Sequence, residues 1–110
     1  MFQANIGDPD DRRRLVYEVL NRYGRIDGLV NNAGIAVGGP LEFLSVEELR
    51  QQFEINVIGQ ITVTQALLPL LRLGQGRIVN IGSISGRVAM PFMGPYSASK
   101  FALGALTDSL

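Results

Sequence analysis

The sequence predicts an α/β fold in which helices flank two to three parallel strands. Segments whose apolar residues recur with helical spacing alternate along the chain with short apolar runs that end in turns. Apolar residues make up 46% of the 110 residues and charged residues 18%, which is typical of a globular chain. Because alternating helices and strands form parallel sheets with right-handed crossovers, we expect a layered α/β domain.

The first predicted helix follows Asp8. Asp8 suits the N-cap position and Pro9 the first helical turn, and Gly24 is a suitable C-cap. Arg12, Arg13 and Arg14 lie among acidic residues, so we predict that they are solvated on the first turns of this helix. The chain has 10 basic and 10 acidic residues and a net charge of +0, so it offers no basic field for nucleic acid.

The clearest strands are two short apolar runs at residues 26–31 and 77–82, and a stub at residues 2–5 is a possible third strand. A last helix is predicted to begin near Tyr96 and to run to the end of the chain. Two strands and three helices do not cover both faces of a parallel sheet. We therefore interpret the chain as part of a larger domain.

The longest predicted helix lies between the two strands. Ser45 and Glu48 form a capping-box pattern at its start, and Pro69 falls near its end. The residues expected along its apolar face are Leu49, Phe53, Val57, Ile61, Thr64 and Leu68.

Residues that can do chemistry gather where the predicted strands end. The first strand closes in Asn31-Asn32-Ala33-Gly34 and the second in Gly82-Ser83, and ligands of open parallel sheets bind at this edge. Tyr96 and Lys100 are four residues apart, so they share one face of a helix and their phenol and ammonium can meet. The chain has no His and no Cys. A lysine-activated tyrosine is therefore the best remaining candidate for a general acid/base near neutral pH.

Taken in this order, these residues resemble the classical short-chain dehydrogenase/reductase family, and Asn56 in the middle of the long helix belongs to the pattern. The resemblance covers essentially the whole chain. It implies a partial Rossmann-like, doubly wound parallel sheet. Residues 1–110 would be the central part of one such domain, without the glycine-rich turn and the C-terminal substrate region of the family.

The resemblance also implies the site residues. The catalytic tetrad would consist of Asn56, Ser83, Tyr96 and Lys100. The cofactor would be NAD or NADP, between which the sequence does not distinguish. Its binding residues would be Asn5, Ile6, Asn32, Ala33, Gly34, Tyr96 and Lys100.

The activity that the resemblance implies is the interconversion of an alcohol and a ketone or aldehyde by hydride transfer, with Tyr96 as the general acid/base. Ser83 would hydrogen-bond the substrate oxygen, Lys100 would activate the phenol and hold the ribose hydroxyls, and Asn56 would hold a water molecule that relays protons. The alternative is a truncated, non-catalytic chain that binds no cofactor by itself. Sugar-nucleotide epimerases share the tyrosine and lysine but not the Asn-Asn-Ala-Gly turn.

The substrate is a small alcohol or carbonyl compound in this interpretation. Met90, Phe92 and Met93 lie between Ser83 and Tyr96, where they could contact an apolar, steroid-like or retinoid-like substrate or simply pack the loop onto the core. We expect a homo-oligomer formed through the long helices and no metal site. No apolar run reaches the roughly 18 residues of a membrane span, and we expect a cytoplasmic protein.

Overall fold

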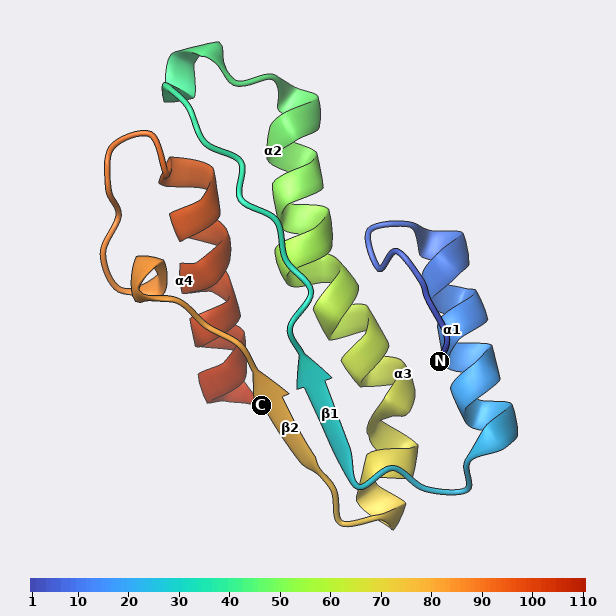
Figure 1. Ribbon diagram of the computed structural model, residues 1–110. Helices are drawn as coiled ribbons and strands as arrows, with labels where there is room; N and C mark the ends of the chain where they lie inside the picture. Colours follow the sequence, from blue (N-terminus) through green and yellow to red (C-terminus); the bar gives the residue numbers. More distant parts are fainter.

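The structure, a computed structural model, describes residues 1–110 and confirms the α/β class. Two short 3₁₀ turns, Leu41–Phe43 and Ile84–Gly86, interrupt the connecting loops. A π-helical turn, Glu54–Gly59, joins the helices on either side of it, α2 (Val46–Phe53) and α3 (Gln60–Leu73), into one continuous rod (Figure 1). The helices and strands are α1 (Pro9–Arg22), β1 (Gly28–Asn31), α2 (Val46–Phe53), α3 (Gln60–Leu73), β2 (Arg77–Asn80) and α4 (Gly94–Ser109).

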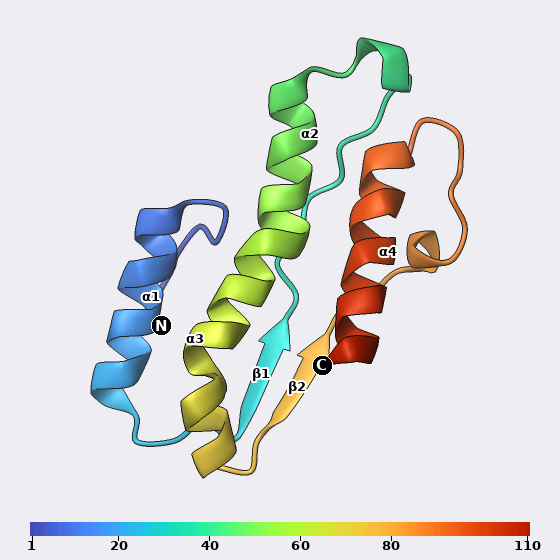
Figure 2. The ribbon, with the colours of Figure 1, turned by 180° about the vertical axis from the view of Figure 1, so that it is seen from behind.

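The two strands pair in parallel, with Gly28 opposite Arg77 and Asn31 opposite Asn80. The helices lie side by side on one face of this small sheet (Figures 1 and 2). On the other face Val30 is 61% exposed and Val79 is 47% exposed. The expectation that these helices do not cover both faces is confirmed, because all of them lie on the same one.

The hydrophobic core lies between the sheet and the helices. Its centre is formed by Val63, Leu67 and Leu71, which follow one another along α3 at helical spacing. Residues of α1, of both strands and of the N-terminal segment pack against this centre: Ile6, Leu15, Val16, Val19, Ile26, Leu29 and Ile78.

A polar network crosses the same interface beside this core. Asn31 Nδ2 donates to Thr64 Oγ1 of α3 at 2.9 Å and to Asn80 Oδ1 of β2 at 2.8 Å. Asn80 Nδ2 donates in turn to Thr107 Oγ1 of α4 at 2.9 Å. The network therefore joins both strands to the two helices that pack on them, so Asn31 has a structural role in the sheet.

The predicted start of the first helix is confirmed, but two nearby predictions are wrong. The Asp8 side chain caps α1 by accepting from Asp10 N at 2.8 Å. The helix ends at Arg22 with Tyr23 as C-cap, one residue earlier than a Gly24 cap would place it. Residues 2–5 form no strand, since Asn5 N donates to the Asp11 carboxylate instead of to a neighbouring strand.

Pro69 lies near the end of the long helix, as predicted, but the stripe of residues that faces the core differs from the prediction. Pro69 lies inside α3, which continues to Leu73; proline removes one helical hydrogen bond, and the carbonyl it frees belongs to the exposed Gln65, where water can satisfy it. The π-helical turn also changes the phase of the helix. After it, the core stripe passes through Val63 and Leu67 rather than through Ile61 and Leu68, which are only partly buried.

The capping box at the start of α2 is confirmed and makes a testable prediction. Glu48 Oε2 accepts from Ser45 N at 2.8 Å and from Ser45 Oγ at 3.0 Å, and these two hydrogen bonds hold the pKa of the Glu48 carboxyl below its usual range. We expect Ser45→Ala to raise this pKa partway toward the usual value, because it removes only the hydroxyl bonds. NMR titration of Glu48 measures the change.

A lowered carboxyl pKa stabilises the folded state above the unfolded pKa, and this contribution is lost as the pH falls through the folded pKa. The wild type should therefore unfold at a higher midpoint temperature than Ser45→Ala at neutral pH, and this difference should become smaller under acidic conditions. Ser45→Thr, which keeps the cap, is the matched control. An unchanged Glu48 titration in Ser45→Ala would contradict this account.

Candidate active site

Helix α4 carries Tyr96 and Lys100 to the carboxyl end of the sheet. Lys100 is 6% exposed, and its Nζ donates to the Ile81 carbonyl at 3.0 Å, just after the end of β2. The same Nζ lies 5.8 Å from the centroid of the Tyr96 ring, which is partly exposed. An ammonium has three donors, so Lys100 can hold the Ile81 carbonyl, keep its charge beside the phenol and still contact a ligand.

Tyr96 and Lys100 open into one cavity of about 280 Å³. The turns that follow the two strands form its other walls, as expected for a ligand site at this edge of a parallel sheet. A Cβ atom added at Gly82 would meet nothing within 4 Å, so the backbone there is open to an incoming group. The remaining lining residues are Asn32, Gly34, Ile35, Ala36 and Ile81.

Ser83 lies in a neighbouring cavity of about 450 Å³, which shares Gly82 and Lys100 with the first cavity. Its Oγ accepts from Ser85 N at 3.1 Å at the start of the 3₁₀ turn. Because a hydroxyl both accepts and donates, this bond fixes the Ser83 oxygen and leaves its proton free for a ligand.

Asn56 is fully buried in the π-helical turn, and its side chain is engaged by the protein. Oδ1 accepts from Ile35 N at 2.9 Å, while Nδ2 donates to Ile35 O at 2.9 Å and to Ser99 Oγ at 3.1 Å. Ser99 Oγ donates to the Tyr96 carbonyl at 2.7 Å. The side chain therefore links the loop after β1 to the first turn of α4, and it does not line the cavity of Tyr96 and Lys100.

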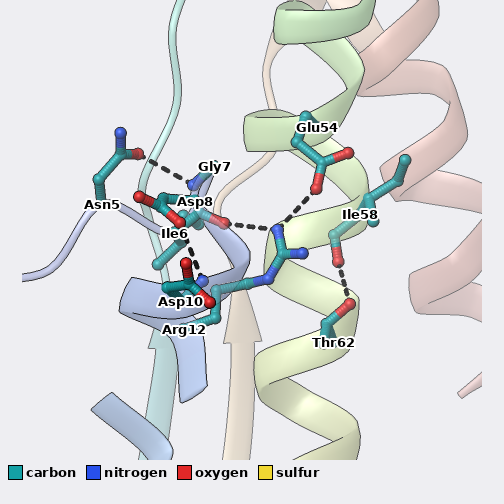
Figure 3. Close-up of polar contacts among 9 residues, drawn as sticks. All are labelled: Asn5, Ile6, Gly7, Asp8, Asp10, Arg12, Glu54, Ile58 and Thr62. Atoms are coloured by element: carbon teal, nitrogen blue, oxygen red, sulfur yellow. Dashed lines mark hydrogen bonds and ion pairs between the residues drawn. The ribbon is translucent and has the colours of Figure 1, made fainter. Parts of the chain in front are cut away.

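Asn5 and Ile6 lie apart from this cavity, between α1 and the π-helical turn (Figure 3). The Asn5 side chain accepts from Gly7 N at 2.9 Å. Arg12 Nη1 donates to Ile6 O at 2.8 Å and to Glu54 Oε1 at 2.7 Å, so this arginine ties the segment to the turn that contains Asn56.

The prediction of three solvated arginines is therefore wrong for Arg12, which is 8% exposed. Its ion pair with Glu54 could not be anticipated, because the two residues are far apart in the sequence. Arg13 and Arg14 are exposed and pair with Asp10 and Asp11 of the same helix, as predicted.

Two buried glutamines, Gln52 and Gln60, also contact the site and were not predicted from the sequence. Both donate to backbone carbonyls of the loop after β1, at Ile35 and Ala33 respectively. The signal in the sequence is an amide at every fourth position, Gln52, Asn56 and Gln60, on a helix face where apolar residues are usual.

The residues around the cavity fit a dinucleotide of the NAD type. The exposed Asn32 side-chain amide has no partner in the chain, and neither have the backbone N–H groups of Ala33 and Gly34. Lys100 adds a positive charge.

No three His, Cys, Asp or Glu side chains cluster as metal ligands. No helix combines the length and apolarity that crossing a bilayer requires.

Comparison with known proteins identifies the family to which the sequence is similar. The family model described as short chain dehydrogenase matches residues 1–110. The 3-amino-tetrahydro-pyrrolizinone reductase of Xenorhabdus hominickii is 55% identical over 83 residues, which are 76% of this chain and 29% of that protein. The 3-ketodihydrosphingosine reductase of Bacteroides thetaiotaomicron is 40% identical over 111 residues, which are 100% of this chain and 41% of that protein.

A solved structure shows the same fold. The alcohol dehydrogenase from the archaeon Thermococcus sibiricus, complexed with 5-hydroxy-NADP, superposes with a TM-score of 0.91 at 28% identity, and the match covers 98% of this chain and 46% of that one. The chain thus spans less than half the length of these relatives and carries part of an NAD(P)-binding Rossmann-type fold. By its sequence and its fold, the chain belongs to the short-chain dehydrogenase family.

Proposed function

We propose that the protein carrying this chain is an NAD(P)-dependent oxidoreductase that interconverts an alcohol and a ketone or aldehyde. The observation that supports it most directly is the cavity that Tyr96 and Lys100 share at the carboxyl end of the sheet. The dehydrogenases and reductases among its relatives support oxidoreduction of this kind.

In this proposal Tyr96 exchanges a proton with the substrate oxygen. Lys100 Nζ lies 5.8 Å from the centroid of the Tyr96 ring, so its positive charge lies beside the phenol that would exchange the proton. Ser83 donates its hydroxyl proton to the same substrate oxygen and stabilises the charge that develops there. Asn56 would hold a water molecule that relays protons, and through Ser99 it keeps the first turn of α4 in place.

The nicotinamide, when bound, supplies the acceptor or donor of the hydride. Asn32, Ala33 and Gly34 would hold the adenosine side through their free backbone N–H groups and the Asn32 side-chain amide, and Lys100 would contact the ribose hydroxyls. Asn5 and Ile6 would bind the adenine from the segment that Arg12 holds against the π-helical turn.

We also propose an apolar substrate, of the steroid or retinoid type. Met90 and Phe92 are each 63% exposed in the loop that precedes Tyr96, so they are not packed into the core. Exposed apolar side chains in the loop between Ser83 and Tyr96 are suited to contact an apolar ligand.

The test is a spectrophotometric assay of the complete open reading frame at the absorbance of the reduced nicotinamide. We expect oxidation of NADH or NADPH with a steroid ketone or retinal to be faster than with a short polar ketone. The reverse preference would contradict the proposed substrate class.

The alternative is a truncated, non-catalytic chain that binds no cofactor by itself, which the exposed Val30 and Val79 on the bare face of the sheet favour. Failure of the complete protein to bind either nucleotide by calorimetry, together with no turnover, would support this alternative and overturn the proposed activity.

A further inference from the structure

Three buried amide side chains form a stripe along the helical rod. Gln52, Asn56 and Gln60 are four residues apart and are 0%, 0% and 1% exposed. The loop that follows β1 runs beside them, close to α2 and the π-helical turn (Figures 1 and 2). Each of the three amides hydrogen-bonds to the backbone of this loop.

The bonds fall on alternate residues of the loop. Gln60 Nε2 donates to Ala33 O, and Asn56 binds both the N–H and the carbonyl of Ile35. Gln52 Oε1 accepts from Val37 N at 2.7 Å, and its Nε2 donates to Ile35 O at 2.8 Å.

This pairing follows from the dimensions of the two segments. Four residues of helix rise about 6 Å, and two residues of extended chain span about 6.6 Å. Amides at every fourth helical position can therefore meet every second residue of an extended loop. The side chains take the place of a neighbouring strand, because they supply hydrogen-bond partners to backbone groups of an extended segment.

The π-helical turn keeps the three amides in line. In a regular α-helix, positions four apart drift by roughly 40° around the axis, so three of them would spread over about 80° of one face. Residues 54–59 form a wider turn with more residues in it, and Asn56 lies within it. The turn thus offsets the drift between Gln52 and Gln60.

The loop held in this way is one wall of the cavity that contains Tyr96 and Lys100. Gly34, Ile35 and Ala36 line that cavity. We propose that Gln52 and Gln60 are positioning residues, which set the distance of this loop from Tyr96 and Lys100 and thereby the fit of the nucleotide. The inference rests on the proposed function, because it assigns the wall to cofactor binding.

Stability alone does not account for the glutamine at position 60. Its Oε1 is buried without a hydrogen-bond partner in the chain. An unpaired buried acceptor is unfavourable, and an apolar side chain of similar size would remove it. The residue keeps an amide whose donor reaches Ala33 O, at the turn proposed to bind the cofactor.

The first test needs no substitution. In the complete protein, amide exchange followed by NMR should show slow exchange at Ile35 and Val37 and fast exchange at Ala36, whose N–H has no partner in the chain. Equally fast exchange at all three residues would overturn the proposal, whatever the activity of the enzyme.

The second test uses Gln52→Met and Gln60→Met, which keep side-chain length and remove the amide. We expect Gln52→Met to accelerate exchange at Val37 about tenfold, and each variant to raise the Kd for NADH or NADPH about tenfold, the effect of one lost hydrogen bond. Since Tyr96 lies on another element, kcat should change much less than the nucleotide KM.

Gln51→Met and Gln65→Met are matched controls, because both glutamines are exposed on the same rod. They should leave the amide exchange of the loop, the nucleotide Kd and kcat as in the wild type.

If Gln52→Met and Gln60→Met lower the unfolding midpoint but match these controls in loop exchange and in nucleotide Kd, the glutamines are structural only. If Gln52→Met does not fold, the exchange pattern of the wild type and the nucleotide Kd of Gln60→Met still test whether the glutamines position the loop. A wild type that binds no nucleotide overturns the proposed function, while the exchange pattern still shows whether the amides hold the loop.

Discussion

Replacing Tyr96 by phenylalanine is expected to lower kcat by a factor of about 10² to 10⁴, the usual contribution of a general acid/base. Phenylalanine keeps the ring beside Lys100 and removes only the hydroxyl, so the cavity should keep its shape. Steady-state rates measured with saturating nucleotide and substrate give kcat, and calorimetry gives the nucleotide Kd. The Kd should stay close to that of the wild type.

Tyr17→Phe is the matched control for this substitution. Tyr17 is 67% exposed on α1 and does not line the cavity, so its hydroxyl should have no effect on turnover. Comparable activity in the Tyr96→Phe and Tyr17→Phe proteins would rule out the acid/base role. Loss of nucleotide binding in Tyr96→Phe would point instead to a role of the hydroxyl in holding the cofactor.

Gly59→Ala is expected to destabilise the protein by about 3 kcal/mol, at the upper end of the cost of overpacking. A Cβ atom at this position would lie 2.5 Å from Ile6 O and 2.9 Å from Glu54 O. Both are backbone atoms, so neither can rotate away. The N-terminal segment would have to move off the π-helical turn, and its hydrogen bond from Arg12 would be strained.

Gly104→Ala is the control, because Gly104 lies inside α4 and a Cβ there would meet nothing within 4 Å. This change should stabilise the protein by about 0.5 to 1 kcal/mol, the usual gain from replacing an interior helical glycine by alanine. Chemical denaturation of both variants measures the difference. Equal midpoints for the two would mean that the close contact between Ile6 and Gly59 does not contribute to stability.

Local signals predicted the parts of the fold that depend on neighbouring residues. Asp8 caps α1 and Ser45 pairs with Glu48 because these contacts are made within one helical turn. Tyr96 and Lys100 also share a helix face, and they do line one cavity. Each of these predictions needs only the spacing of a few residues.

The features that were missed depend on contacts between distant segments. The ion pair of Arg12 with Glu54 joins α1 to the π-helical turn across 42 positions of sequence. Residues 2–5 were predicted as a possible strand, but no strand lies beside them to pair with. Periodicity assumes a regular helix, so it could not predict the π-helical turn or the change of phase that moves the core stripe to Val63.

The polar network between the sheet and the helices has a consequence for how the chain avoids wrong pairings. A sheet of two four-residue strands buries few side chains, so hydrophobic contacts alone discriminate poorly between registers. Sliding β2 by one residue would turn Asn80 toward the bare face and leave Asn31 buried with one partner fewer. That misaligned state would lose the bond between Asn31 and Asn80 and the bond from Asn80 to Thr107 on α4. Asn31 and Asn80 thus favour the native register, because their bond to each other and the bond from Asn80 to α4 form together only when the two strands are correctly aligned.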